Sequence, residues 1–264
     1  MSKTLVVGDL HTKFHILDKV KQLIPKYDKV VFLGDYVDEW DTVPEASYNL
    51  LTSLKELYEQ NPHKIVLLLG NHELSEWLEG NFKCSGWNPT TSNYVKDFMY
   101  KFHSIFQLAY AQDDFLFTHA GITNEWAKKY LFTEPYITYS LLTAGDITNE
   151  LNHTLRHYED NDIDEKIFNG LSEVGYHRGG WGTPSPIWAD LNDLLADPLE
   201  GIKQVVGHTP IYTAMHYQTH QTDLYCCDTH SLTPQKEPIG DDSLLQIIDG
   251  KINKISIDGK EISW

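Results

Sequence analysis

A short apolar run that ends in glycine and a polar residue recurs along this chain, and it constrains the fold more than any other feature. In the first third, residues 4–7, 29–33 and 64–69 are such runs. Their nearly continuous β-branched and leucine content is typical of strands that are buried on both faces. Residues 15–23 and 44–59, which lie between the runs, have helical periodicity. This alternation predicts βαβ units and a parallel sheet.

The middle of the chain continues the alternation less regularly. The sequence predicts a helix at residues 91–106, a fourth strand at 115–118 and a mixed, largely helical segment at 124–168. The glycine- and proline-rich residues 175–188 are expected to form a loop. Residues 204–206 predict a further strand that ends in another glycine and a histidine.

The last third of the chain is rich in strand-forming residues. It predicts strands at residues 223–227, 244–248 and 251–257. Asp249 and Gly250 separate the last two and are typical of a hairpin turn. We therefore expect these final strands to be antiparallel and the sheets of the protein to be mixed.

No Pro-, Ser- or Gly-rich linker, repeat or low-complexity block divides the 264 residues. We therefore expect one domain, residues 1–264, in which residues 124–185 are a candidate insertion that sets specificity. The 21 Lys and Arg against 38 Asp and Glu give a net charge of −17. Such a field repels polyanions, and no basic patch offsets it, which argues against long nucleic acid as a partner.

The cysteines and the N-terminus bear on the compartment. Cys84, Cys226 and Cys227 do not have the spacing of a disulfide framework, which favours a reducing environment. The N-terminal apolar run turns polar at Asp9, too early for the core of a signal peptide. No window is long and apolar enough to span a membrane. We expect a cytoplasmic protein with no membrane partner, and the sequence leaves the oligomeric state open.

His, Asp and Asn side chains follow five predicted strands at their carboxyl ends, where ligands bind on open parallel sheets. One such Asp alone is usually a turn or helix cap, but five strand ends in a row indicate a shared site. Carboxylate, imidazole and amide oxygen are ligands for Mn, Fe, Zn or Mg, and a central carboxylate can bridge two ions. The set is Asp9, His11, Asp35, Asp38, Asn71, His72, His119 and His208.

The motifs GDLH, GDYVD, GNHE, HAG and GHTP, in this order between Gly8 and Pro210, resemble the calcineurin-like metallophosphoesterase superfamily. GDYVD, GNHE and SPIW are most similar to its phosphoprotein phosphatase-like branch. That branch includes bacterial and phage protein phosphatases and the symmetrical diadenosine tetraphosphate hydrolases. The resemblance implies an α/β fold with mixed sheets, a four-layer αββα sandwich.

The same resemblance implies roles for the residues of the set. Two divalent ions, foremost Mn²⁺ with Fe, Zn, Ni or Mg as alternatives, are the expected cofactors. His72 is expected to be the general acid, kept charged by Asp38, because a carboxylate beside an imidazole raises its pKa. The implied metal ligands, with Asp35 as the bridge, are Asp9, His11, Asp35, Asn71, His119 and His208.

Two positions depart from the pattern of these relatives. Glu39 follows GDYVD, where the protein phosphatases usually have an Arg that holds the substrate phosphate. A carboxylate repels phosphate, so Arg178 in the glycine-rich loop is the candidate for substrate binding. His230 stands where relatives often have Gly. It could line the pocket, although an exposed loop histidine is the simpler expectation.

The expected activity is hydrolysis of phosphate esters by a metal-bridging hydroxide, on a phosphorylated substrate. A serine/threonine-type phosphoprotein phosphatase is the first reading, and a dinucleoside polyphosphate hydrolase is the alternative. Trp77, Trp87, Trp181 and Trp188 could stack on a nucleobase or could belong to the core. A hypothesis of another class is a catalytically inactive binding module on the same fold.

Overall fold

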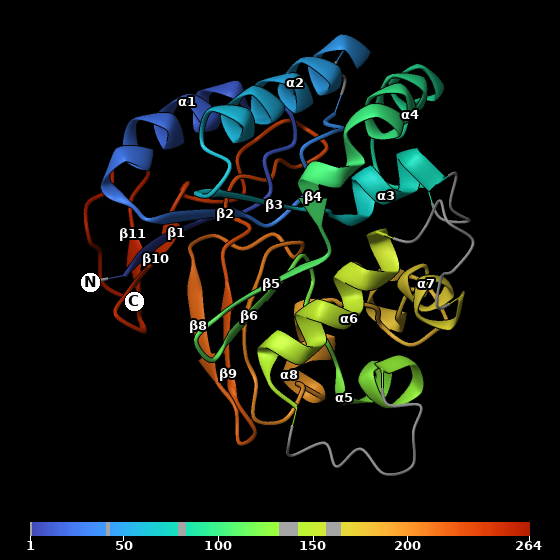
Figure 1. Ribbon diagram of the computed structural model, residues 1–264, viewed down its shortest axis with the longest axis vertical. Helices are drawn as coiled ribbons and strands as arrows, with labels where there is room; N and C mark the ends of the chain where they lie inside the picture. Colours follow the sequence, from blue (N-terminus) through green and yellow to red (C-terminus); the bar gives the residue numbers. More distant parts are fainter. Residues whose placement is uncertain (1, 41–42, 79–82, 132–141, 157–164) are drawn as a thin grey trace.

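The computed structural model describes residues 2–40, 43–78, 83–131, 142–156 and 165–264. Two mixed β-sheets pack face to face, and helices cover their outer sides (Figure 1). This is the four-layer arrangement that the sequence predicts. The predicted single domain and the specificity region at residues 124–185 stay predictions.

The first sheet has six strands in the order β11-β10-β1-β2-β3-β4. The four strands β1 to β4 are parallel neighbours, whereas β10 is antiparallel to both β1 and β11. The strands are β1 (Lys3–Val7), β2 (Lys29–Phe32), β3 (Ile65–Leu68), β4 (Phe106–Gln107), β10 (Leu244–Ile248) and β11 (Lys251–Ile255).

The second sheet has five strands in the order β5-β6-β7-β9-β8. Its central strands β6, β7 and β9 are parallel, and the edge strands β5 and β8 are antiparallel to their neighbours. The strands are β5 (Ala109–Gln112), β6 (Phe115–Thr118), β7 (Lys203–Val206), β8 (Met215–Gln218) and β9 (Asp223–Cys226).

The helices fall into two groups (Figure 1). The six-stranded sheet is accompanied by α1 (Phe14–Leu23), α2 (Pro44–Gln60), α3 (Asn71–Leu78) and α4 (Pro89–Phe102). Beside the five-stranded sheet lie α5 (Asn124–Trp126), α6 (Ala144–Arg156), α7 (Glu165–Leu171) and α8 (Leu191–Ala196). Short 3-10 turns occupy Ile24–Lys26, His103–Ile105 and Tyr176–Arg178, and Ala127–Leu131 is a π-helical turn.

Alternate residues of each central strand contribute to different apolar layers. In β1, Leu5 and Val7 pack under the helices, whereas Val6 lies between the two sheets. In β7, Val205 lies between the sheets and Val206 packs against α8. Each such side chain stabilises the fold by roughly 1.5–3 kcal/mol through burial. Strands that are buried on both faces explain why the predicted runs were apolar throughout.

Several predicted elements need correction. The helix predicted at 91–106 ends at Phe102, and Phe106 begins β4. The predicted fourth strand at 115–118 is confirmed, but it is the sixth along the chain because β4 and β5 precede it. The strand predicted at 223–227 is β9, which is antiparallel to β8, as expected for the final strands, but parallel to β7.

Other predictions are confirmed. The hairpin of β10 and β11 turns at Asp249 and Gly250, whose φ angles of 48° and 75° suit a type I′ turn. The described part of residues 124–168 is helical, and its residues 132–141 and 157–164 lie outside the described residues. No helix among the described residues has the length and apolar character needed to cross a membrane.

Candidate metal centre

All eight side chains of the predicted set meet where the carboxyl ends of both sheets converge. The ends of β1, β2 and β3 supply six of them, and the ends of β6 and β7 supply His119 and His208. His11 is 14% exposed through its side chain, and the other seven residues are buried. Parallel strands explain this convergence, because their carboxyl ends point to the same edge of a sheet.

Several residues of the cluster have unusual backbone conformations. Asp35, Asp38 and His208 have positive φ angles of 50°, 58° and 64°, which cost energy in residues other than glycine and cluster at functional sites. Gly34, with φ 112°, precedes Asp35, and a Cβ there would lie 2.6 Å from the backbone nitrogen of Gly70. A Cβ on Gly70 would lie 2.1 Å from Asp35 Oδ1. The two glycines therefore let the two strand ends close around the Asp35 carboxylate.

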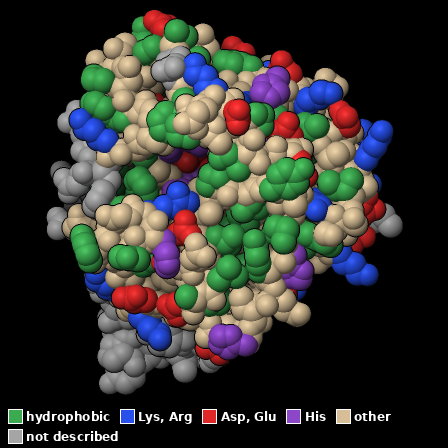
Figure 2. Space-filling view, turned by 180° about the vertical axis from the view of Figure 1, so that it is seen from behind, with side chains coloured by type: hydrophobic (Ala, Val, Ile, Leu, Met, Phe, Trp, Pro, Cys, Tyr) green, Lys and Arg blue, Asp and Glu red, His purple; other side chains and the backbone are tan. Residues whose placement is uncertain are grey.

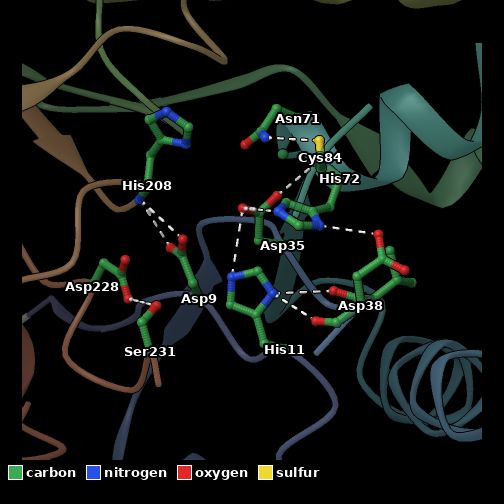
Figure 3. Close-up of polar contacts among 12 residues, drawn as sticks. Asp9, His11, Asp35, Asp38, Asn71, His72, Cys84, His208, Asp228 and Ser231 are labelled. Carbon is green, nitrogen blue, oxygen red and sulfur yellow. Dashed lines mark hydrogen bonds and ion pairs between the residues drawn. The ribbon is translucent and has the colours of Figure 1, made fainter. Parts of the chain in front are cut away.

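The Asp35 carboxylate lies at the centre of the cluster (Figure 3). Its Oδ2 is 3.3 Å from His119 Nε2, 3.8 Å from His11 Nε2 and 3.9 Å from His72 Nε2. Burial alone would raise the pKa of Asp35, but the imidazoles of His119, His72 and His11 hold it well below its usual range. The group is therefore ionised and faces ligand-type atoms on both sides.

Backbone carbonyls fix the tautomers of two histidines. His11 Nδ1 donates to the carbonyl oxygens of Val37 and Asp38 at 3.1 and 2.9 Å. His119 Nδ1 donates to the carbonyl of Leu33 at 2.9 Å. In the neutral form of each ring the lone pair is then on Nε2, the atom that faces Asp35. Such hydrogen bonds from the other ring nitrogen are the usual support of a metal-binding histidine. Burial opposes a charge on His119, but the carboxylates of Asp35 and Asp9 raise its pKa to about 9, so without a metal ion this ring carries a proton on Nε2.

Atoms that can carry lone pairs converge around His119 Nε2. This atom is 2.9 Å from Asn71 Oδ1 and 3.1 Å from His208 Nδ1, besides the Asp35 carboxylate. The Asn71 amide nitrogen is turned away and donates to Cys84 Sγ at 3.1 Å, so its oxygen faces the cluster. Lone pairs that crowd together in a buried place need a cation or a proton among them. The donor set therefore fits a divalent metal.

The candidate ligand atoms form two groups that share Asp35. One comprises His11, Asp35 and His72, and the other Asp35, His119 and His208, with the atoms of each group within 4.8 Å of one another. A carboxylate common to two groups can bridge two ions. The predicted ligand Asp9 is outside these groups. Both of its carboxylate oxygens accept the backbone N–H of His208 at 3.1 Å, and Figure 3 shows its side chain between His11 and His208.

His72 and Asp38 form the predicted pair. His72 Nδ1 lies 3.0 Å from Asp38 Oδ2, and Nε2 points toward Asp35 (Figure 3). Burial opposes a charge on His72, but the neighbouring Cys84, Asp35 and Asp38 raise its pKa well above the usual value. The ring can therefore hold a proton on Nε2, the atom that faces the centre, although the same atom is also placed as a ligand could be.

Glu73 is a site residue that was not predicted from the sequence. It is fully buried, and its carboxylate accepts the backbone N–H groups of Asp35, Tyr36, Val37 and Gly70 at 2.6–3.1 Å. Burial, together with the charge of Asp35, raises its pKa to about 7. The residue shapes the loop that carries Asp35. Its position directly after His72 in the GNHE motif was the available signal.

The segment after β9 adds two further buried polar residues. Asp228 accepts a hydrogen bond from the hydroxyl of Ser231 at 2.8 Å and lies beside Asp9 in Figure 3. The expectation of an exposed His230 is wrong. This side chain is buried, and its Nδ1 lies 3.1 Å from the carboxylate of Asp242. The Asp242 carboxylate holds the ring away from the cavity, which is lined by the next residue, Ser231.

A cavity of about 350 Å³ opens above the cluster, and Figure 2 shows acidic and histidine side chains at the floor of a hollow. Glu39 lines it but is paired with Lys13, and the two side chains are only 12% and 9% exposed. Arg178 also lines it. Its Nε lies 2.9 Å from Asp190, and Nη2 donates to the carbonyl of His208 and the hydroxyl of Thr209. Arg178 therefore lies beside the cluster, where the sequence predicts it.

The four tryptophans that could stack on a nucleobase lie in different surroundings. Trp188 lines the cavity, Trp77 packs against the apolar core and Trp181 is 93% exposed. Trp87 lies in a neighbouring cavity. Trp40, which was not singled out from the sequence, lines the first cavity as well.

Comparison with known proteins gives a family match over most of the chain. A family model described as calcineurin-like phosphoesterase matches residues 2–234. A protein serine/threonine phosphatase from Saccharomyces cerevisiae with similarity to human phosphatase PP5 has a TM-score of 0.51 at 14% identity, and the match covers 97% of this chain and 80% of that one.

Two further solved structures are similar. A metallophosphoesterase from Sphaerobacter thermophilus has a TM-score of 0.43 at 12% identity, over 100% of this chain and 89% of that one. The E. coli phosphoesterase Yfce has a TM-score of 0.43 at 12% identity, over 99% and 97% of the two chains. No curated protein sequence matches.

Proposed function

The chain belongs to the calcineurin-like phosphoesterase family of metal-dependent phosphoester hydrolases, and we propose that it hydrolyses phosphomonoesters, with serine/threonine-type phosphoproteins as the substrate class. The observation that carries the proposal is the Asp35 carboxylate. It lies 3.3–3.9 Å from the Nε2 atoms of three histidines and is common to two ligand groups. This arrangement suits two ions that act on one phosphoryl group.

We assign the ligands as follows. His11 and Asp9 would hold one ion, Asn71, His119 and His208 the other, and Asp35 would bridge them. Bound there, two divalent ions, foremost Mn²⁺, supply Lewis acidity for the phosphoryl oxygens and an activated water as nucleophile. The described residues fit this role because their lone pairs converge and the rings are held by backbone carbonyls.

The chain's own side chains then orient the substrate and move the proton. Arg178 binds a phosphoryl oxygen at the cavity wall, since a guanidinium suits phosphate. The oxygen of water forms a bond to phosphorus as the bond from phosphorus to the leaving oxygen breaks. His72 gives the proton on Nε2 to that leaving oxygen, while Asp38 holds Nδ1 and keeps the ring oriented. The proton lost by the water returns to His72 through solvent.

A dinucleoside polyphosphate is the second candidate substrate. The observation in its favour is the pair of indole rings, Trp40 and Trp188, that line the cavity. Indole faces stack on nucleobases irrespective of their sequence. The phosphoprotein remains the first candidate because the cavity opens to solvent, where a phosphorylated side chain of another protein can reach the cluster.

Two variants test the proposal on protein loaded with Mn²⁺. Asp35→Asn should bind less metal by elemental analysis and lose hydrolysis of aryl phosphates by at least about 100-fold. His72→Ala should retain metal but lose kcat by roughly 10²–10⁴, with the largest loss on the poorest leaving group. Full turnover by Asp35→Asn would refute the bridge. Equal losses on good and poor leaving groups would refute the acid role of His72.

A further inference from the structure

A second cavity adjoins the first one and shares a wall with it. Its volume is about 400 Å³, and Ser75, Trp87, Asn93 and Lys96 are among the residues that line it. Lys83 lines both cavities. A ligand seated over the metal centre could therefore extend past Lys83 into a second, polar space with two lysines in its wall.

Lys83 differs from the other cations near the centre in its partner. Lys13 is paired with Glu39, and Arg178 with Asp190. In the described part of the chain the contact of Lys83 is with an aromatic ring, its Nζ lying 3.6 Å from the centroid of Trp87. A cation–π contact holds an ammonium in place without neutralising its charge. Lys83 therefore presents a positioned positive charge where the two cavities meet.

The second cavity lies on the side of the proposed proton donor. Ser75 follows His72 by three residues on α3, which is about one helical turn. Lys83 precedes Cys84, whose sulfur contacts Asn71, whereas Arg178 contacts His208. Figure 3 shows Cys84 and His208 on opposite sides of Asp35. The leaving group departs next to the acid, so its distal part should enter the second cavity.

We propose that the second cavity is a leaving-group subsite in which Lys83 binds a further phosphate carried by the leaving group. The inference rests on the proposed phosphoesterase activity and deepens it. It predicts a preference for substrates with two phosphates, either in a nucleotide anhydride or on neighbouring residues of a peptide.

The test compares substrates that differ in one phosphate. In AMP the leaving group is a nucleoside, and in ADP it carries its own phosphate. A second pair consists of peptides with one and with two adjacent phosphoserines. The measured quantity is kcat/KM for the doubly phosphorylated substrate divided by kcat/KM for the singly phosphorylated one, in whichever pair the protein hydrolyses. Lys83→Ala should lower this ratio by about tenfold, which is the size of one charge-assisted contact. Lys83→Arg should retain most of the ratio.

A matched control removes a lysine elsewhere. Lys251→Ala on β11 removes the same charge and should leave the ratio unchanged. An equal loss on both substrates would overturn the proposal, because Lys83 would then contact the transferred phosphoryl group. An unchanged ratio would overturn it too.

Binding provides a readout that does not need turnover. Calorimetric titration with pyrophosphate and with inorganic phosphate should show a loss of affinity in Lys83→Ala that is larger for pyrophosphate. A wild-type protein that hydrolyses none of these substrates would contradict the proposed activity, and the titration would still decide the subsite. Equal losses of affinity for both anions would exclude it.

Discussion

At the scale of single residues, Glu76 is a buried acid near Asp38, the residue that pairs with His72. It is fully buried, and burial, together with the charge of Asp38, raises its pKa to about 8. Because the unfolded chain has the ordinary lower pKa, the native state binds more protons between these values. The contribution of Glu76 to stability therefore falls as pH rises from about 4.5 toward 8.

Glu76→Gln should remove much of this pH dependence. The amide is neutral at every pH, so the variant should gain stability relative to wild type at pH 8 and little at pH 5. Urea unfolding at several pH values measures the difference. Glu56→Gln, an exposed position on α2, is the matched control and should follow the wild-type profile. Parallel profiles for Glu76→Gln and wild type would contradict the assignment.

The convergence of the ligand-type residues could be predicted from the sequence because strand ends place them by topology alone. Asp35 and His119 follow runs whose apolar character is unmistakable, so their convergence could be foreseen. Glu73 was missed because its function is to accept backbone N–H groups from another strand end. The expectation for His230 was wrong because its burial and its pairing with Asp242, twelve residues away, depend on tertiary contacts.

At the scale of elements, one side chain of α6, Asn152, hydrogen-bonds to the backbone where the five-stranded sheet begins. Asn152 Oδ1 accepts the backbone N–H groups of Leu108 and Ala109, and its Nδ2 donates to the carbonyl of Ala109. Asn152→Ala would leave three buried backbone groups unpaired. We expect the free energy of unfolding to fall by about 2–4 kcal/mol.

Chemical denaturation measures this loss. Asn149→Ala, at an exposed position of the same helix, controls for the change in helix propensity and should alter stability by less than about 0.5 kcal/mol. A loss in Asn152→Ala no larger than in the control would show that water satisfies the exposed backbone groups.

Elements with a clear apolar pattern were predicted with the right bounds, and elements with a weak one were missed or misplaced. β6 and β10 have the predicted bounds because their residues are almost all buried. β8 was missed because it is an edge strand whose residues are alternately half-buried and exposed, so its sequence is not apolar. β4 has only two residues and follows α4 closely, so the apolar Phe106 at its start was assigned to the helix. α3 was missed because its first residues, Asn71 and His72, were considered only as ligands.

At the scale of the whole molecule, the candidate centre lies where the two sheets meet. Asp9 and Asp35 belong to the six-stranded sheet and His208 to the five-stranded one. Burial and the neighbouring Asp228 raise the pKa of Asp9 well above its usual value, which shows that acids are crowded there. Ions held by ligands from both sheets would relieve this crowding and would bind only the folded chain.

Chelation should therefore lower the melting temperature. Binding at 100 times the Kd contributes about 2.7 kcal/mol, which corresponds to a shift of roughly 5–10 °C for a domain of this size. Calorimetry with and without EDTA measures it. Asp35→Asn should show a smaller shift. An equal shift in this variant would place the stabilising ions elsewhere on the molecule.

The pairing of Lys13 with Glu39 has a consequence for how this protein can change over generations. Glu39→Arg alone would set two cations against each other in a nearly buried place. We expect the two positions to be epistatic, so that an arginine in place of Glu39 becomes tolerable only after Lys13 has been replaced. A double-mutant cycle on the free energy of unfolding would measure that dependence.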